Sequence, residues 1–119
     1  MYKEFNDQFP DVSNKANHIH MAYWGEINDD AYSWFASLAT ALNKEMIRQP
    51  PNKTHEAIFE FFRQHYLMGD AQTKNCIDVS LVENLFWQVP QNKIEPYWTL
   101  FPGKLKCLYE AFHGSPPRT

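Results

Sequence analysis

The sequence predicts an all-α protein in which six or seven short helices pack at steep angles within one compact domain. Three observations support this fold class. Apolar residues recur at intervals of three and four, no stretch alternates polar and apolar residues as a strand does, and breakers divide the chain into segments of helical length. These breakers are Pro10, Gly25, Pro50, Pro51, Gly69, Pro90, Pro96, Pro102, Gly103 and Gly114. A short solenoid-like stack of helix pairs is an alternative, although no repeat period is visible.

The first part of the chain predicts three helices. Residues 2–9 form a short helix that stops before a proline, and residues 12–24 form a weaker helix that ends at a glycine. Residues 31–48 form the clearest helix, because seven apolar residues share one face and a Pro-Pro pair follows. These seven residues are Ala31, Trp34, Phe35, Leu38, Ala41, Leu42 and Met46.

The next predicted helix covers residues 54–68. Ile58, Phe61 and Phe62 lie on one side of it, and other aromatic residues widen the apolar surface, so we expect this helix to be central. Gly69 is placed to end it in the left-handed conformation that glycine adopts at helix ends.

Shorter helices follow. Ser80 and Glu83 have the spacing of a capping box, in which each side chain accepts a hydrogen bond from the other residue's backbone N–H, so a helix is expected to start there. Pro96 fits the first turn of a further short helix, and residues 104–113 form the last one, with Gly114 as its stop. The apolar stripe expected after the capping box consists of Leu81, Val82, Leu85, Phe86 and Val89.

Length and composition predict one helical domain over residues 1–114 and a frayed tail at 115–119. The 11 basic and 14 acidic residues give a net charge of −3, which argues against direct contact with nucleic acid. No apolar run is long enough for a membrane span, and the polar start does not resemble a signal peptide. A cytoplasmic location with Cys76 and Cys107 in the reduced state is therefore expected.

The five histidines form no recognisable catalytic or metal-binding motif. HExxH, CxxC and a glycine-rich phosphate loop are all missing from the sequence, so we expect a protein that is not an enzyme and has no cofactor or metal. A small hydrolase using His55 or His65 with Glu56 or Glu60 is the less favoured alternative, because catalytic partners need only meet in space.

Aromatic residues are the stronger functional signal, since nine Phe, six Tyr and four Trp make up 16% of the chain. On the helix expected after the capping box, Trp87 falls about 170° from the apolar stripe and shares the outer face with Glu83. Trp87 therefore either packs against a neighbouring helix or is an exposed anchor for a partner. In the second case Tyr97 and Trp98, in the next segment, extend the patch.

A second aromatic candidate, Tyr23-Trp24, is followed by acidic residues. Glu26, Asp29 and Asp30 lie in a stretch that has no Lys or Arg, and an acidic surface there would steer a basic partner. The alternative is an ordinary solvated turn that also caps the following helix.

The order of segments resembles a group of small all-helical bacterial proteins. The resemblance spans about residues 2–90 and rests on Phe5 to Phe9-Pro10, Gly25-Glu26, Tyr32-Ser33-Trp34-Phe35 with Leu38-Ala39, and the run from Val79 to Leu85. This group includes immunity proteins encoded beside polymorphic or contact-dependent growth-inhibition toxins. The resemblance implies a protein that binds a toxin domain, usually a nuclease, and blocks its active site; it assigns no binding residue.

Together these observations predict an intracellular immunity-type protein that covers the active site of a basic toxin domain. The partner-binding residues expected from their chemistry are Glu26, Asp29, Asp30, Glu83, Trp87, Tyr97 and Trp98. Another interaction adaptor, or a helical module that associates with itself, is the alternative in the same class. The sequence does not indicate the oligomeric state.

Overall fold

A computed structural model describes residues 1–25 and 31–117. Throughout this part of the chain the regular elements are helical and no strand occurs, which confirms the predicted all-α fold class. The seven α-helices are α1 (Tyr2–Gln8), α2 (Pro10–Trp24), α3 (Ala31–Arg48), α4 (Lys53–Met68), α5 (Ala71–Cys76), α6 (Gln91–Leu100) and α7 (Gly103–His113).

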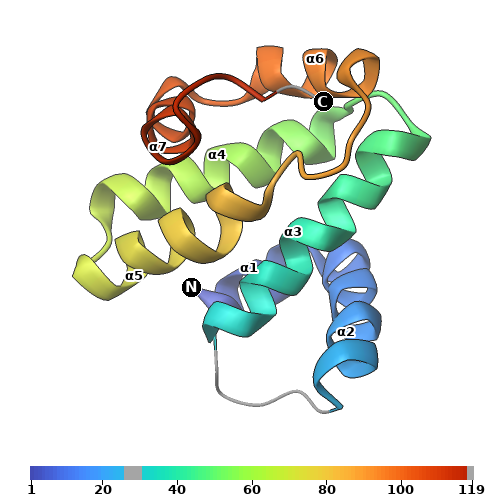
Figure 1. The fold of residues 1–119 in the computed structure, drawn as a ribbon. Coiled ribbons are helices and arrows are strands. Elements are labelled where there is room, and N and C mark those ends of the chain that lie inside the picture. Colours follow the sequence, from blue (N-terminus) through green and yellow to red (C-terminus); the bar gives the residue numbers. More distant parts are fainter. Residues whose placement is uncertain (26–30, 118–119) are drawn as a thin grey trace.

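Helix α3 crosses the middle of the molecule (Figure 1). Helix α2 lies on one side of it and α4 and α5 on the other; α1 passes behind it, and α6 and α7 lie along the top of this view. The apolar face expected for α3 is confirmed, since Trp34, Phe35, Leu38 and Met46 are all buried. The radius of gyration, 13.3 Å, is close to the value of about 13.5 Å typical of a globular chain of this length. The helices thus enclose a single core.

The end of α4 differs from the prediction. Gly69 is extended, with φ −80° and ψ 166°, and not left-handed. The reason lies in the next helix, because an extended Gly69 lets Asp70 cap α5, where its carboxylate accepts a hydrogen bond from the Thr73 N–H at 2.8 Å. A glycine is needed for space, since a Cβ at this position would lie 2.5 Å from the His65 carbonyl oxygen.

The prediction that a helix starts at Ser80 is also wrong. The chain is already helical from Ala71; it passes through a π-helical turn, η1 (Ile77–Leu81), and a 3₁₀ turn, η2 (Val82–Asn84), before the helix ends. Ser80 is buried inside this stretch and makes no capping box; its carbonyl accepts a hydrogen bond from Asn84 Nδ2 at 2.7 Å. The upstream cap at Asp70 therefore sets the start of the helix. The expected apolar residues Leu81, Val82, Leu85, Phe86 and Val89 are nevertheless all buried.

Helix α6 begins earlier than predicted. It starts at Gln91, directly after Pro90, whose carbonyl accepts hydrogen bonds from the backbone N–H groups of the first turn. Pro96 therefore lies in the second turn of α6 and not in its first. Helix α7 agrees with the prediction, since Gly114 follows it with φ +82° in the left-handed conformation.

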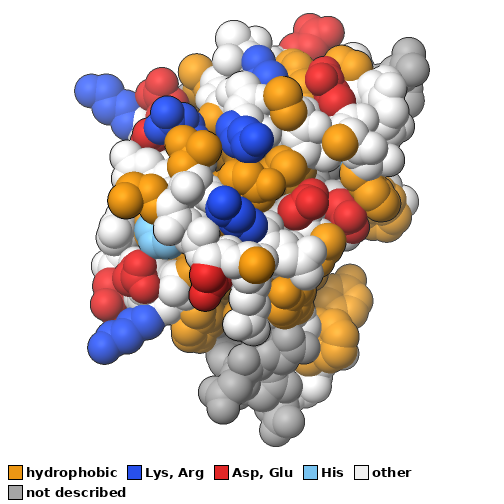
Figure 2. Space-filling view, turned by 90° about the vertical axis from the view of Figure 1, so that its left-hand side faces the viewer, with side chains coloured by type: hydrophobic (Ala, Val, Ile, Leu, Met, Phe, Trp, Pro, Cys, Tyr) orange, Lys and Arg blue, Asp and Glu red, His pale blue; other side chains and the backbone are white. Residues whose placement is uncertain are grey.

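The expected tail at residues 115–119 is described only as far as Pro117, which is buried. Figure 2 shows one face of the molecule, turned by 90° from Figure 1, on which basic, acidic and small apolar patches alternate. Such a mixture is typical of an ordinary solvated surface. In the described ranges, no helix is long and apolar enough to cross a membrane.

Candidate functional site

Three large aromatic side chains are exposed around one hollow of the surface. Tyr23 and Trp24, at the end of α2, are 78% and 58% exposed, and Trp87, after η2, is 69% exposed. The hollow between them has a volume of about 520 Å³, and small side chains of α3 form its floor. We call this surface the aromatic face; its residues are Ile19, Tyr23, Trp24, Ala36, Ser37, Thr40 and Trp87.

Trp87 sits on a turn with an unusual backbone. The residues on either side of it, Phe86 and Gln88, have φ of +68° and +55°. Side chains other than glycine rarely adopt this left-handed region, and each such residue costs about 1 kcal/mol or more. The surrounding structure must therefore hold the turn in place.

Asn43 of α3 supplies this support from inside the molecule. Its side-chain oxygen accepts a hydrogen bond from the Phe86 N–H at 2.7 Å, and its amide group donates to the Asn84 carbonyl at 2.9 Å. Both bonds are to backbone groups just before Trp87, and Asn43 is only 7% exposed. A buried side chain thus fixes the path of the turn.

Phe86 anchors the same turn in the core. Its ring makes edge contacts with Trp98, Phe101 and Tyr109 at centroid distances of 5.4 to 5.7 Å. Because Phe86 points inward and is 3% exposed, Trp87 is forced outward. The sequence placed Trp87 on the outer face of a regular helix that is not present, and left open whether it packs against a neighbouring helix or is exposed; in the structure the side chain is exposed.

Glu83 lies close to Trp87, as the sequence suggested. Both residues line a second hollow of about 390 Å³, together with Tyr109 and His113. Burial, followed by the nearby charge of Asp78, raises the pKa of the Glu83 carboxyl, while His113 acts in the opposite direction. The structure therefore brings together two of the seven predicted partner-binding residues.

Tyr97 and Trp98 do not extend the aromatic face. Tyr97 is 1% exposed and donates a hydrogen bond from its hydroxyl to the Gln49 carbonyl at 2.9 Å, so its prediction as a surface anchor is wrong. The register of α6 explains this, because Tyr97 follows the buried Ile94 by three positions and shares its inner side. Trp98 is half-buried against Phe86.

Glu26, Asp29 and Asp30 lie outside the described residues, so their prediction as partner-binding acids stays a prediction.

The histidines considered for a hydrolase are separated and serve other contacts. His55 is buried, accepts a hydrogen bond from the Asn52 N–H through Nδ1, and points Nε2 at Glu45. His65 stacks on Phe61 and contacts Glu4 at 2.9 Å. No group of three or more His, Cys, Asp or Glu residues suited to hold a metal occurs in the part of the chain that the structure describes.

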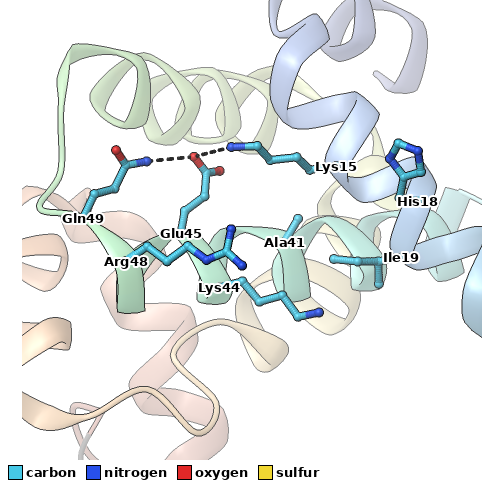
Figure 3. A pocket seen from close by; sticks show the side chains of 8 residues that line it. All are labelled: Lys15, His18, Ile19, Ala41, Lys44, Glu45, Arg48 and Gln49. Carbon is cyan, nitrogen blue, oxygen red and sulfur yellow. Dashed lines mark hydrogen bonds and ion pairs between the residues drawn. The ribbon is translucent and has the colours of Figure 1, made fainter.

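Sequence reasoning missed a basic cavity between α2 and α3. It has a volume of about 420 Å³ and adjoins the aromatic face at Ile19. The signal was present in the helical spacing, since Lys44 and Arg48 are four residues apart and Lys15 and His18 are three apart, so each pair shares a face. The pairing of α2 with α3 brings these two faces together (Figure 3).

Comparisons with known proteins give one match. A family model described as a domain of unknown function, DUF7674, matches residues 2–114, from the start of α1 to the end of α7. The comparisons with curated proteins and with solved structures found no match.

Proposed function

The chain belongs to the DUF7674 family, and we propose that it is a protein-binding module that holds its partner on the aromatic face. One observation carries this proposal: a strained turn, fixed by Asn43, presents Trp87 to solvent. Backbone strain of this kind is found most often at sites that bind or react.

The chemistry of the aromatic face suits a protein partner. Trp and Tyr are the residues most enriched among those that dominate binding energy at interfaces. Tyr23, Trp24 and Trp87 surround a hollow into which a side chain of the partner would fit. Because the turn is already fixed in the unbound protein, little entropy is lost on ordering it, and this favours affinity.

We further propose that the partner is a toxin domain and that this protein is its immunity protein. The resemblance described above and the net charge of −3 support this form of the proposal. Glu83, beside Trp87, would add a negative charge at the edge of the contact and favour a basic partner.

Co-purification with the product of the neighbouring gene tests the proposal. We expect a stoichiometric complex with its C-terminal domain, and we expect that domain to be lethal when expressed alone. W87A should weaken the complex by at least about tenfold, the usual effect of truncating a dominant interface residue. M68A is the matched control, because Met68 is 88% exposed on α4, away from the aromatic face.

Other outcomes separate the alternatives. A complex that W87A and M68A weaken equally would overturn the assignment of the aromatic face. A harmless neighbour with no complex would remove the immunity role. If sedimentation then showed a stable homodimer that W87A dissociates, self-association would replace it, because the exposed Trp87 of one copy would fit the hollow of the other.

A further inference from the structure

We propose that the basic cavity between α2 and α3 is a second binding site, which takes a small phosphate monoester with a hydroxyl group near its phosphate. This site is independent of the partner-binding role proposed for the aromatic face.

Positive side chains meet at this cavity from two helices. Lys15 comes from α2, and Lys44 and Arg48 come from α3. Figure 3 shows Arg48 running back along α3 toward Glu45, with Lys15 reaching the same carboxylate from the opposite helix. Three cations and one acid thus line this cavity in a chain whose net charge is −3.

The single acid is already engaged. Glu45 Oε1 contacts Gln49 Nε2 at 3.2 Å, His55 Nε2 at 3.4 Å and Lys15 Nζ at 3.5 Å. Burial opposes ionisation of this carboxyl, but the His55 and Lys15 contacts outweigh it, so the pKa of Glu45 is lowered and the group is charged at neutral pH. Its charge offsets that of Lys15.

Lys44 and Arg48 remain unbalanced, since neither makes an ion pair with any residue of ranges 1–25 and 31–117. Like charges four residues apart on a helix repel each other. The helix dipole of α3 favours a positive charge at Arg48, which lies in its last turn. The dipole does not explain why α2 places a second positive charge, Lys15, at the same cavity. The local excess of two positive charges matches the charge of a phosphate monoester.

The other features of the cavity define the rest of the ligand. A volume of about 420 Å³ is within the usual range for small-molecule sites. The planar guanidinium of Arg48 is suited to bind two oxygens of a phosphate at once, and Ile19 and Ala41 offer an apolar surface to the carbon skeleton.

Glu45 adds a second, independent observation. Its Oε2 atom is buried and has no hydrogen-bond donor among residues 1–25 and 31–117, an arrangement that costs free energy. A small movement of the exposed Lys15 side chain, which is 55% exposed, would let a ligand hydroxyl donate to this oxygen. We therefore expect a hydroxylated ester to bind more tightly than inorganic phosphate.

An NMR titration of the ¹⁵N-labelled protein with glycerol 2-phosphate tests the site. We expect saturable shifts confined to the amides of residues 15–19 and 41–49, with a millimolar or lower Kd. K44Q and R48Q should each raise that Kd by about tenfold, the effect of removing a charged hydrogen bond. Inorganic phosphate should bind at least about fivefold more weakly, because it lacks the hydroxyl and the carbon skeleton.

Two controls separate this site from general charge effects and from the aromatic face. K93Q removes an exposed lysine on α6, and W87A alters the aromatic face; both should leave the Kd unchanged while the amide spectrum shows a folded protein. Shifts that stay linear up to tens of millimolar, or a Kd that K93Q raises as much as R48Q does, would overturn the site. Equal affinity for inorganic phosphate would overturn the ester as its ligand.

Discussion

At the scale of single residues, the backbone around Trp87 concentrates most of the unusual geometry. Phe86 and Gln88 both have positive φ, and yet neither is a glycine. The backbone strain at Phe86 is offset by burial of its side chain and by the hydrogen bond that its N–H donates to Asn43. Gln88 is exposed and lacks such burial, so its strain can be measured directly.

Q88G should therefore stabilise the protein. Glycine adopts positive φ without strain, so we expect the free energy of unfolding in urea to rise by about 0.5–1 kcal/mol. Q72G is the matched control, because Gln72 is exposed within α5, where glycine costs about 1 kcal/mol. If both variants lose stability to the same extent, the turn at Gln88 is not strained.

The buried Tyr97 predicts that the stability of the fold decreases at alkaline pH. Burial, with a smaller contribution from the charge of Glu45, raises its pKa to about 12. Since the phenol ionises more easily when unfolded, near pH 10, its contribution to stability is complete below that pH and is lost as the pH rises toward 12.

Y97F should separate this effect from ordinary alkaline unfolding. At pH 8 it should lower the free energy of unfolding by about 1 kcal/mol, because the hydrogen bond to Gln49 is lost. Between pH 10 and pH 12 its stability should fall less steeply than that of the natural chain. The stability of Y97F will still decrease somewhat with pH, since burial also raises the pKa of Tyr109. Parallel curves for the two proteins would contradict the prediction.

At the scale of helices, the sequence was sufficient where several signals agreed. Residues 31–48 were predicted with the bounds that α3 has, because a continuous apolar stripe and a Pro-Pro pair indicate the same segment. Two residues, Asp70 and Ser80, each have a side chain that could cap the start of a helix in this segment. The apolar residues after Ser80 are compatible with a helix that starts at either one. The π-helical turn of η1 shifts the register in a way that no 3.6-residue pattern can predict.

The same limit applies to the candidate site. Exposure of Trp87 depends on the Asn43 contact, which joins residues 43 positions apart, and no local pattern encodes such a contact. Tyr97 was misplaced because Pro96 was assigned to a first turn, which left the inner side of α6 undefined. The basic cavity could be predicted from the sequence in principle, but only once α2 had been paired with α3.

The junction of α4 and α5 gives a test at this scale. G69A should lower the free energy of unfolding by about 1–3 kcal/mol, because its Cβ would press on the His65 carbonyl and on Thr73. G103A is the control: it has open space around the added Cβ, so thermal unfolding should change little or occur at a slightly higher temperature. A G69A protein as stable as G103A would show that this junction can relax.

At the scale of the whole molecule, Glu45 connects three parts of the fold. It joins α3 to Lys15 of α2 and to His55 in the first turn of α4. Because its pKa is lowered in the folded state, its contribution to stability is present above the unfolded value and is lost as the pH falls through the folded one.

E45Q should accordingly make the free energy of unfolding depend less on pH in the acid range. We expect a loss of about 1 kcal/mol at pH 7 and a smaller further loss than in the natural chain between pH 5 and pH 3, measured by urea unfolding. E60Q is the control, since Glu60 forms an exposed pair with Arg63, and such pairs contribute little. An acid slope identical to that of E60Q would show that Glu45 does not link the helices.

The placement of the four tryptophans has an optical consequence. Trp34 is 1% exposed in the core, and Trp98 is half-buried, whereas Trp24 and Trp87 are largely open to solvent. A collisional quencher such as acrylamide would therefore reach the emission of Trp24 and Trp87 well before that of the other two. The unlabelled protein reports through its own fluorescence whether the aromatic face is covered.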